Sequence, residues 1–283
     1  MNMRYQVVRC TCLLMCVAIV RCASAQLTFD LAADFSASHN PNGAWSFGWM
    51  APGSASFNPY TTPFAAYGLG LDEWRGAFPD DNGSAPPNVI YNPTDTAITV
   101  SDTTWLPHQV TFHPGAQDER SVIRWTASFT GPASLSAAFE GRSGFVTSGV
   151  EIYQNSTLLF SGSVLGAGVS SRLSVATNLA LQVGDVIDFR VNYGNGDWAS
   201  DTTQIAAVIS PVPGPSLTIL FLPSDSARLT WPTNNPGYHL ESAAQIPTRF
   251  WSPVTNAPVV QADQFAVTVG TSNQSQFFRL RKQ

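Results

Sequence analysis

Cysteine is missing from almost the whole of this 283-residue chain. The four cysteines, Cys10, Cys12, Cys16 and Cys22, all lie at the N-terminus. Without cysteine, the rest of the chain can form neither a disulfide nor a thiolate zinc site. The folded part must therefore be stabilised without cross-links between thiols.

The N-terminal cysteines belong to a segment with the features of an export signal. Arg4 and Arg9 precede an apolar run over residues 13–20, and Ala23-Ser24-Ala25 follows it. This order predicts a secretory signal peptide over residues 1–25, cleaved after Ala25. The run is too short for a permanent bilayer span, so we expect a protein secreted to the extracellular space or cell surface. Lipidation of Cys22 and retention as an anchor are the alternatives, although Arg21 fits lipoprotein processing poorly.

Charge is also scarce, which limits the fold class. Charged residues make up 12% of the chain, and Lys282 is its single lysine. Long helices need periodic runs of Ala, Leu, Glu, Lys and Arg, and none is present. The chain instead contains 21 glycines and 20 prolines. This composition predicts an all-β protein with short strands and many turns.

The few charges are unevenly distributed. Residues 26–213 carry 16 acidic and 6 basic side chains, whereas residues 214–283 carry 3 acidic and 5 basic ones. An acidic body excludes nucleic acid as the expected partner, because phosphates require a basic surface. The basic C-terminus is too short to form a polybasic membrane patch.

A proline-rich stretch divides the chain into two predicted domains. Alternate prolines at residues 211–216 favour an extended, stiff linker. Before it, residues 121–127 and 185–191 alternate apolar and polar side chains with the period of half-buried antiparallel strands. We therefore predict a jelly-roll-like β-sandwich over residues 26–210 and a small Ig/fibronectin-like β-sandwich over residues 217–283. Residues 51–88 alternate weakly, which indicates either a surface excursion or a functional loop.

Five ordered motifs in the first domain resemble a known family. They are Asn-Pro-Asn-Gly-Ala-Trp-Ser-Phe-Gly-Trp at 40–49, His-Pro-Gly at 113–115, and the segments 121–127, 184–189 and 201–203. Together they resemble uncharacterised secreted bacterial β-sandwich domains that often occur in proteins with PEP-CTERM sorting tails. The resemblance covers residues 28–210 and implies a jelly-roll-like fold but no agreed activity. The apolar helix and basic tail of that context do not follow residues 213–216, so we do not expect sorting by such a tail.

The C-terminal segment shows a second resemblance. Leu-Thr-Trp-Pro at 229–232, Gly-Tyr-His-Leu-Glu-Ser at 237–242, Trp251 and Phe-Phe-Arg-Leu-Arg at 277–281 are similar to a module appended to many secreted bacterial proteins. That module looks like a reduced fibronectin type III or immunoglobulin-like sandwich. The resemblance implies a role in spacing or attachment, with catalysis the less expected role.

Motifs for catalysis are missing. The four histidines form no His-Glu-x-x-His pair, and no Gly-x-Ser-x-Gly nucleophile elbow occurs. His113 lies in a turn motif where its imidazole is expected to bond backbone groups. Adjacent acids occur at 72–73, 80–81 and 118–119, but neighbours on a strand point to opposite faces. We therefore expect a protein that is not an enzyme, with a glycan-active hydrolase as an alternative because such enzymes need only two suitably placed carboxylates.

A cluster of Asn and Asp residues suggests calcium as a ligand. Calcium prefers several hard oxygen ligands on a flexible loop. The candidate ligands are Asp188, Asn192, Asn195, Asp197 and Asp201. The alternative is a turn that uses Asn, Gly and Asp for conformational reasons alone.

Aromatic residues suggest what the first domain binds. Trp125 lies on the apolar face of its predicted strand. Trp45, Phe47 and Trp49 share one face of another predicted strand. We therefore assign all four to the core. Exposed aromatic rings beside polar loops can stack on sugar rings. The candidate stacking residues are Trp74, Trp198, Tyr60 and Tyr67. We therefore expect a binding module for a neutral polysaccharide or cell-surface glycan, with a structural surface or matrix protein as a further alternative.

The export hypothesis predicts the mass of the mature protein. Because small residues at 23 and 25 suit signal peptidase, the secreted form should begin at Gln26. Intact-mass spectrometry of protein collected from the medium measures this directly. A mass that retains residues 1–25, or one that includes a diacyl group on Cys22, contradicts the expectation.

Overall fold

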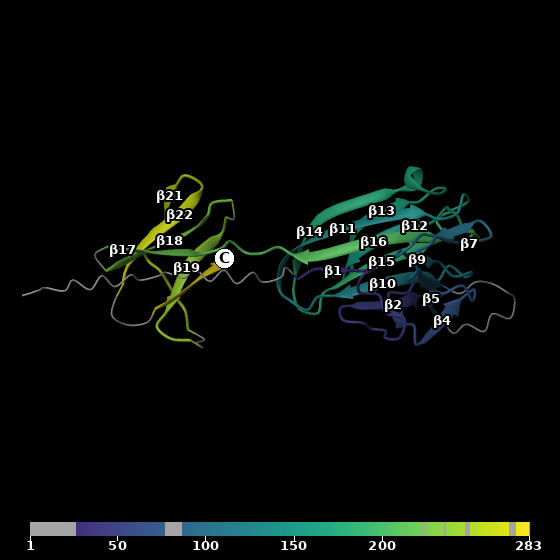
Figure 1. Cartoon of the computed structure of the whole chain (residues 1–283), viewed down its shortest axis with the longest axis horizontal. Helices are drawn as coiled ribbons and strands as arrows, with labels where there is room; N and C mark the ends of the chain where they lie inside the picture. Colours follow the sequence, from purple (N-terminus) through teal and green to yellow (C-terminus); the bar gives the residue numbers. More distant parts are fainter. Residues whose placement is uncertain are drawn as a thin grey trace, which may run out of the picture.

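The computed structural model describes residues 27–76, 87–223, 225–234, 236–246, 250–271 and 276–282. Within these ranges the regular elements are β-strands, apart from one 3-10 turn, η1, at Val169–Ser171. The all-β fold class is confirmed: a jelly-roll-like sandwich is followed by a smaller, Ig/fibronectin-like one (Figure 1). No helix in the described ranges is long and apolar enough to cross a membrane. The predicted signal peptide lies outside the described residues.

Two antiparallel sheets form the larger sandwich. The first has the order β14-β11-β16-β9-β6-β5-β4, with β1 also paired to β16. Its strands are β1 (Phe29–Asp30), β4 (Thr62–Ala66), β5 (Leu71–Arg75), β6 (Asn88–Tyr91), β9 (Val110–His113), β11 (Gly131–Gly141), β14 (Leu173–Leu181) and β16 (Thr203–Pro211). The second has the order β13-β12-β15-β10-β2-β3. Its strands are β2 (Trp45–Met50), β3 (Asn58–Pro59), β10 (Arg120–Thr126), β12 (Gly149–Gln154), β13 (Thr157–Ser163) and β15 (Val186–Asn192).

A short hairpin lies outside the two main sheets of the larger sandwich. It consists of β7 (Ile98–Val100) and β8 (Thr103–Trp105). Trp105 packs with Leu71 and Ile90 in a separate small apolar cluster, and its Nε1 donates to the Thr111 hydroxyl at 3.0 Å. The hairpin is thereby fixed against β5, β6 and β9.

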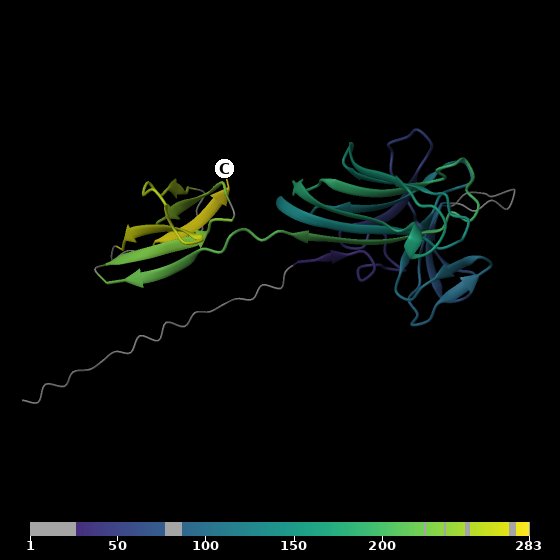
Figure 2. The same cartoon turned by 90° about the horizontal axis from the view of Figure 1, so that it is seen from above.

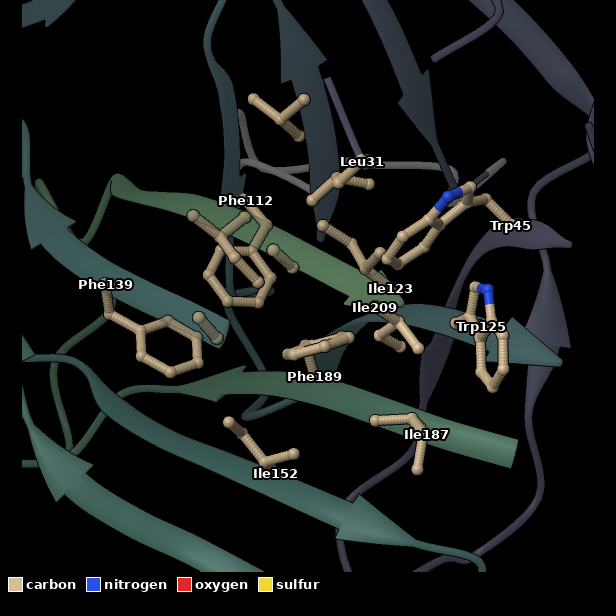
Figure 3. Close-up of a cluster of buried hydrophobic side chains, with 14 of the residues drawn as sticks. Leu31, Trp45, Phe112, Ile123, Trp125, Phe139, Ile152, Ile187, Phe189 and Ile209 are labelled. Carbon is tan, nitrogen blue, oxygen red and sulfur yellow. The ribbon is translucent and has the colours of Figure 1, made fainter. Parts of the chain in front are cut away.

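The core of the larger sandwich forms where alternate side chains of the two sheets meet (Figure 3). In β10, Ile123 and Trp125 are buried, and in β15 Ile187, Phe189 and Val191 are buried. The predicted alternation of both segments is therefore confirmed. Trp45 and Phe47 are also fully buried, while Trp49 is partly buried against the same core. Aromatic and branched side chains on one face of each strand thus form the core that holds the two sheets together.

The smaller sandwich has its own apolar cluster, which includes Leu229, Trp231, Leu240 and Val267. One sheet has the order β17-β18-β22-β21, and the other has the order β20-β19-β23. Their bounds are β17 (Thr218–Leu222), β18 (Ser226–Pro232), β19 (Tyr238–Ala243), β20 (Ser252–Pro253), β21 (Val259–Gln261), β22 (Gln264–Gly270) and β23 (Phe277–Lys282).

The connection between the sandwiches is shorter than the predicted linker. Strand β16 runs through Pro211, and the Val212 N–H donates to the Pro132 carbonyl at 2.9 Å. The extended segment therefore starts at Pro213 and ends where β17 begins at Thr218 (Figure 2). Proline ends the ladder because it has no N–H to donate.

A buried carboxylate joins two strands on the outer face of the second sheet. Asp188 is 1% exposed, and its oxygens accept from Arg124 at 2.7 and 2.9 Å and from Arg190 at 3.0 Å. The Phe57 ring covers the Arg124 guanidinium, and the Tyr153 ring covers that of Arg190. The rings shield the two ion pairs from water, which strengthens the pairing.

Removal of this carboxylate should destabilise the larger sandwich strongly. Asp188→Ala leaves two guanidiniums facing each other, so we expect a loss of roughly 3–5 kcal/mol in the free energy of unfolding. Urea denaturation of the two proteins measures the difference. Asp95→Ala is the control, because the Asp95 carboxylate also contacts a basic side chain, His108 at 2.8 Å, but is 94% exposed, and it should behave like wild type. Equal midpoints for both variants would contradict the importance of the buried pair.

Candidate functional site

One end of the larger sandwich collects several loops that carry Asn, Asp and Ser side chains. Antiparallel pairing places the ends of β9, β11, β13 and β15 beside the starts of β10, β12, β14 and β16. We call this the loop end, and it comprises residues 101–102, 114–119, 142–148, 164–172 and 193–202. It lies at the opposite end of β16 from the connection to β17 (Figure 1).

Side chains of Asn and Asp set the backbone of loop 193–202. The Asn192 side-chain oxygen accepts from the Gly194 N–H at 2.9 Å, and that of Asn195 accepts from the Asp197 N–H at 2.9 Å. Gly194 has a φ of +68°, and a side chain there would collide with the Thr147 carbonyl. Glycine is therefore required, and the loop is held closely against residues 147–149.

Asp201 fixes the same loop from inside the protein. The residue is fully buried, and its Oδ1 accepts from the Thr147 N–H at 2.6 Å and from the Thr147 hydroxyl at 3.2 Å. Its Oδ2 is buried without a hydrogen-bond partner. Burial raises the pKa of Asp201 to about 6, despite the bonds from Thr147, and the nearby Asp197 charge adds to this rise.

Asp102 ties three segments together at the surface. From the tip of the β7–β8 hairpin, its Oδ2 accepts from the Ser143 hydroxyl at 2.5 Å and from the Ser200 hydroxyl at 2.8 Å. These hydrogen bonds lower the pKa of Asp102, so the carboxylate stays ionised. One oxygen atom thus joins the hairpin tip, loop 142–148 and loop 193–202.

Trp198 is a partly exposed aromatic residue of loop 193–202, as is Tyr193. Its ring meets the His113 ring edge-on, with centroids 6.1 Å apart. The His113 Nδ1 donates to the Pro114 carbonyl at 2.6 Å, as expected from the His-Pro-Gly turn. Burial lowers the pKa of His113 to about 4, so the imidazole that supports Trp198 is neutral at pH 7.

Two of the four predicted stacking residues belong to the core. Trp74 is 3% exposed, and its Nε1 donates to the Ser36 carbonyl at 2.8 Å. Tyr60 is also buried, with its hydroxyl 3.3 Å from that of Ser121, and burial raises its pKa. The assignment of Trp74 and Tyr60 to a ligand site is wrong. The stretch read as irregular contains β4 and β5, and Trp74 occupies an inward position of β5.

The other two predicted stacking residues lie apart. Tyr67 is exposed at the turn between β4 and β5, with its ring 5.4 Å from that of Trp105. The end of β5 pairs with Asn88, which pairs with His113 at the loop end. Tyr67 packs on Trp105 of the β7–β8 hairpin, whereas Trp198 packs on His113 at the end of β9.

The structure does not support a calcium site built from the five predicted ligands. Both oxygens of Asp188 are occupied by arginines on the outer sheet face, as described above. The side-chain oxygens of Asn192 and Asn195, and one of Asp197, accept N–H groups of their own loop. Among the described residues no group of three or more His, Cys, Asp or Glu side chains is placed to hold a metal ion. The Asn and Asp residues form a hydrogen-bonded turn.

The adjacent acids behave as strand and turn geometry requires. Glu73 is buried, and burial raises its pKa, whereas Asp72 is only partly buried. Glu119 accepts from the Gln117 N–H at 2.8 Å in a turn. The pair at residues 80–81 lies outside the described residues.

Sequence reasoning missed Asp102, Ser143 and Ser200. Ser143 and Ser200 are 41 and 98 positions away from Asp102 in the chain. No local motif marks such a contact, because it depends on which loops the strand order brings together. The strand order β11-β16-β9 in the first sheet brings these loops to the same end of the sandwich.

Comparisons with known proteins give no family. No protein-family model and no curated protein match the chain. The K1 cleaved adhesin domain of Lys-gingipain from Porphyromonas gingivalis matches 61% of this chain and 100% of its own, with 11% identity and a TM-score of 0.30. CBM51 from Clostridium perfringens GH95, in complex with methyl-galactose, matches 36% of this chain and 68% of its own, with 15% identity and a TM-score of 0.28. A CBM4 structure matches 48% of this chain and 93% of its own, with 16% identity and a TM-score of 0.27. Similarity this low carries no inference about a ligand.

The two buried titratable groups of the loop end should affect stability in opposite directions. The pKa of His113 is depressed to about 4 from 6.5, so its contribution to stability is lost as pH falls from about 6.5 to about 4. The pKa of Asp201 is raised to about 6 from 3.8, so its contribution is lost as pH rises through about 6.

Substitution of Asp201 should therefore leave the pH dependence of stability that comes from His113. In Asp201→Asn the free energy of unfolding should rise more steeply between pH 4 and 6 than in wild type, and the difference should level off above that range. Urea denaturation at several pH values provides the measurement. Parallel pH profiles for the two proteins would show that Asp201 keeps an ordinary pKa.

Proposed function

We propose that this protein is a secreted, non-catalytic binding module for neutral carbohydrate, and that the loop end of the larger sandwich is its binding surface. The observation that carries the proposal is the position of Trp198. Its ring is partly exposed, while the backbone that carries it is fixed by the hydrogen bonds of loop 193–202 and by Asp201. A rigid aromatic ring binds a sugar face with little loss of conformational entropy.

The charges around Trp198 favour an uncharged ligand. Asp102 is ionised at the loop end, and Asp197 is close enough to Asp201 to raise its pKa. Asp118 and Glu119 act on the neighbouring Tyr193, whose pKa is raised by burial first and by these charges in addition. Several negative charges at one end of the sandwich repel uronate or sulfate groups. Their oxygens can accept hydrogen bonds from sugar hydroxyls.

The smaller sandwich has a separate role in this proposal. Its apolar cluster is distinct from that of the larger one, and an extended segment from Pro213 to Leu217 joins the two. We propose that it spaces the binding domain from its point of attachment or attaches it, in line with its resemblance to modules appended to secreted proteins.

Replacement of Trp198 should weaken binding without unfolding the domain. A stacking contact is worth about 1–3 kcal/mol, so Trp198→Ala should remove most retention in affinity gels that contain laminarin, xylan, galactan or starch. Its thermal midpoint should fall less than that of a buried-tryptophan variant, because Trp198 is partly exposed.

Trp74→Ala provides the contrasting variant for this experiment. Loss of a buried tryptophan should cost roughly 3–5 kcal/mol of folding stability, and any fraction that remains folded should still bind. If wild type is retained by none of the polysaccharides, the proposal fails. Retention on cells with no glycan binding then favours a structural surface protein, and release of sugar from a polysaccharide favours a hydrolase.

A further inference from the structure

Phe145 is the most unexpected side chain of the loop end. It is 73% exposed, although the next residue, Val146, is fully buried in the core. The loop that carries it is well braced, since its own N–H donates to the Ser143 hydroxyl at 3.3 Å and the Val146 N–H donates to the Ser143 carbonyl at 3.4 Å. A large apolar ring held in water by an ordered loop indicates a contact surface.

The loop of Phe145 is tied to the loop of Trp198 at two points. Ser143 precedes Phe145 by two positions, Ser200 follows Trp198 by two, and both hydroxyls donate to the same oxygen of Asp102. The second tie runs through Asp201, which accepts from Thr147 and donates its N–H to the Trp198 carbonyl at 3.3 Å. The two aromatic residues are therefore presented together by loops that cannot move independently.

We propose that Phe145 and Trp198 are two stacking positions of one binding site for an extended neutral glycan, and that Asp102 is the positioning residue that sets their separation. This inference rests on the proposed function and specifies its ligand: a chain of at least two sugar units and not a single sugar. One ring holds one sugar face, so the second ring adds affinity only for a longer chain.

The observations favour a glycan over a lipid surface. Two further apolar residues, Leu165 and Val169, are exposed on the neighbouring loop 164–172. Insertion into a lipid surface would use all three apolar side chains alike, whereas glycan stacking uses the aromatic one. The ionised Asp102 among these loops opposes burial in a bilayer. Val169→Ala therefore separates the two occupants.

The first test measures how affinity depends on ligand length. Calorimetric titrations would use laminari-, xylo-, galacto- and malto-oligosaccharides of one to about six units. For wild type we expect affinity to rise about tenfold between one and about three units. Phe145→Ala should lose this gain while binding of the monosaccharide is unchanged, and Trp198→Ala should weaken binding at every length. Val169→Ala, the matched control at the same end, should behave like wild type.

The second test concerns Asp102 as the positioning residue. Asp102 accepts from the buried Ser143 hydroxyl and from the Ser200 hydroxyl, so Asp102→Ala should lower the thermal midpoint modestly and leave the protein folded. It should nevertheless lose the length-dependent gain, as Phe145→Ala does, and keep monosaccharide affinity. Asp102→Asn retains one acceptor oxygen for the serine hydroxyls and should restore part of the gain. A role in stability alone would lower the midpoint and leave the length dependence intact.

Three results would overturn the inference. If wild type binds oligosaccharides but Phe145→Ala keeps the full gain with length, the two-ring site is wrong while the proposed function stands. If wild type binds none of the oligosaccharides or polysaccharides, both fail. If wild type sediments with phosphatidylcholine vesicles, and both Phe145→Ala and Val169→Ala abolish this, the loop end binds lipid.

Discussion

Burial of aromatic rings between two antiparallel sheets is the interaction on which the rest of this structure depends. Trp45, Trp125 and Phe189 from the second sheet meet Phe112 and Phe139 from the first in one continuous cluster (Figure 3), to which Phe47 of the second sheet also belongs. Such side chains are the largest source of hydrophobic stabilisation that a small set of positions can provide. Because the described residues contain no cysteine, this burial stabilises the domain without disulfides.

The packed sheets also determine what the loops can do. Because strand register is fixed by the core, the strand ends that carry loops 142–148 and 193–202 are fixed too. Two carboxylates then connect these loops: Asp201 from within the protein and Asp102 from the surface. The result is a rigid surface, and rigidity in the free protein is what lowers the entropic cost of binding.

The sequence predicts the fold better than the site, for physical reasons that particular residues show. Alternation at 121–127 and 185–191 identifies core strands, since period-two burial is a local property. The prediction for Trp74 and Tyr60 is wrong because residues 51–88 alternate weakly and yet contain short strands. The sequence predicts Asp188 as a metal ligand because its partner Arg124 becomes its neighbour only through the pairing of β10 with β15. Asp102 was missed because its partner serines come from loops far away in the chain.

The central claim is that ligand binds at the loop end beside Trp198, and indole NMR tests it most directly. The eight tryptophans each give one Nε1–H signal, and substitution of Trp198 identifies its own. During titration with the oligosaccharide series the Trp198 signal should shift most, whereas those of the buried Trp45, Trp74 and Trp125 should stay in place. A saturating titration that leaves the Trp198 signal unchanged, while the signal of another tryptophan moves, contradicts the account.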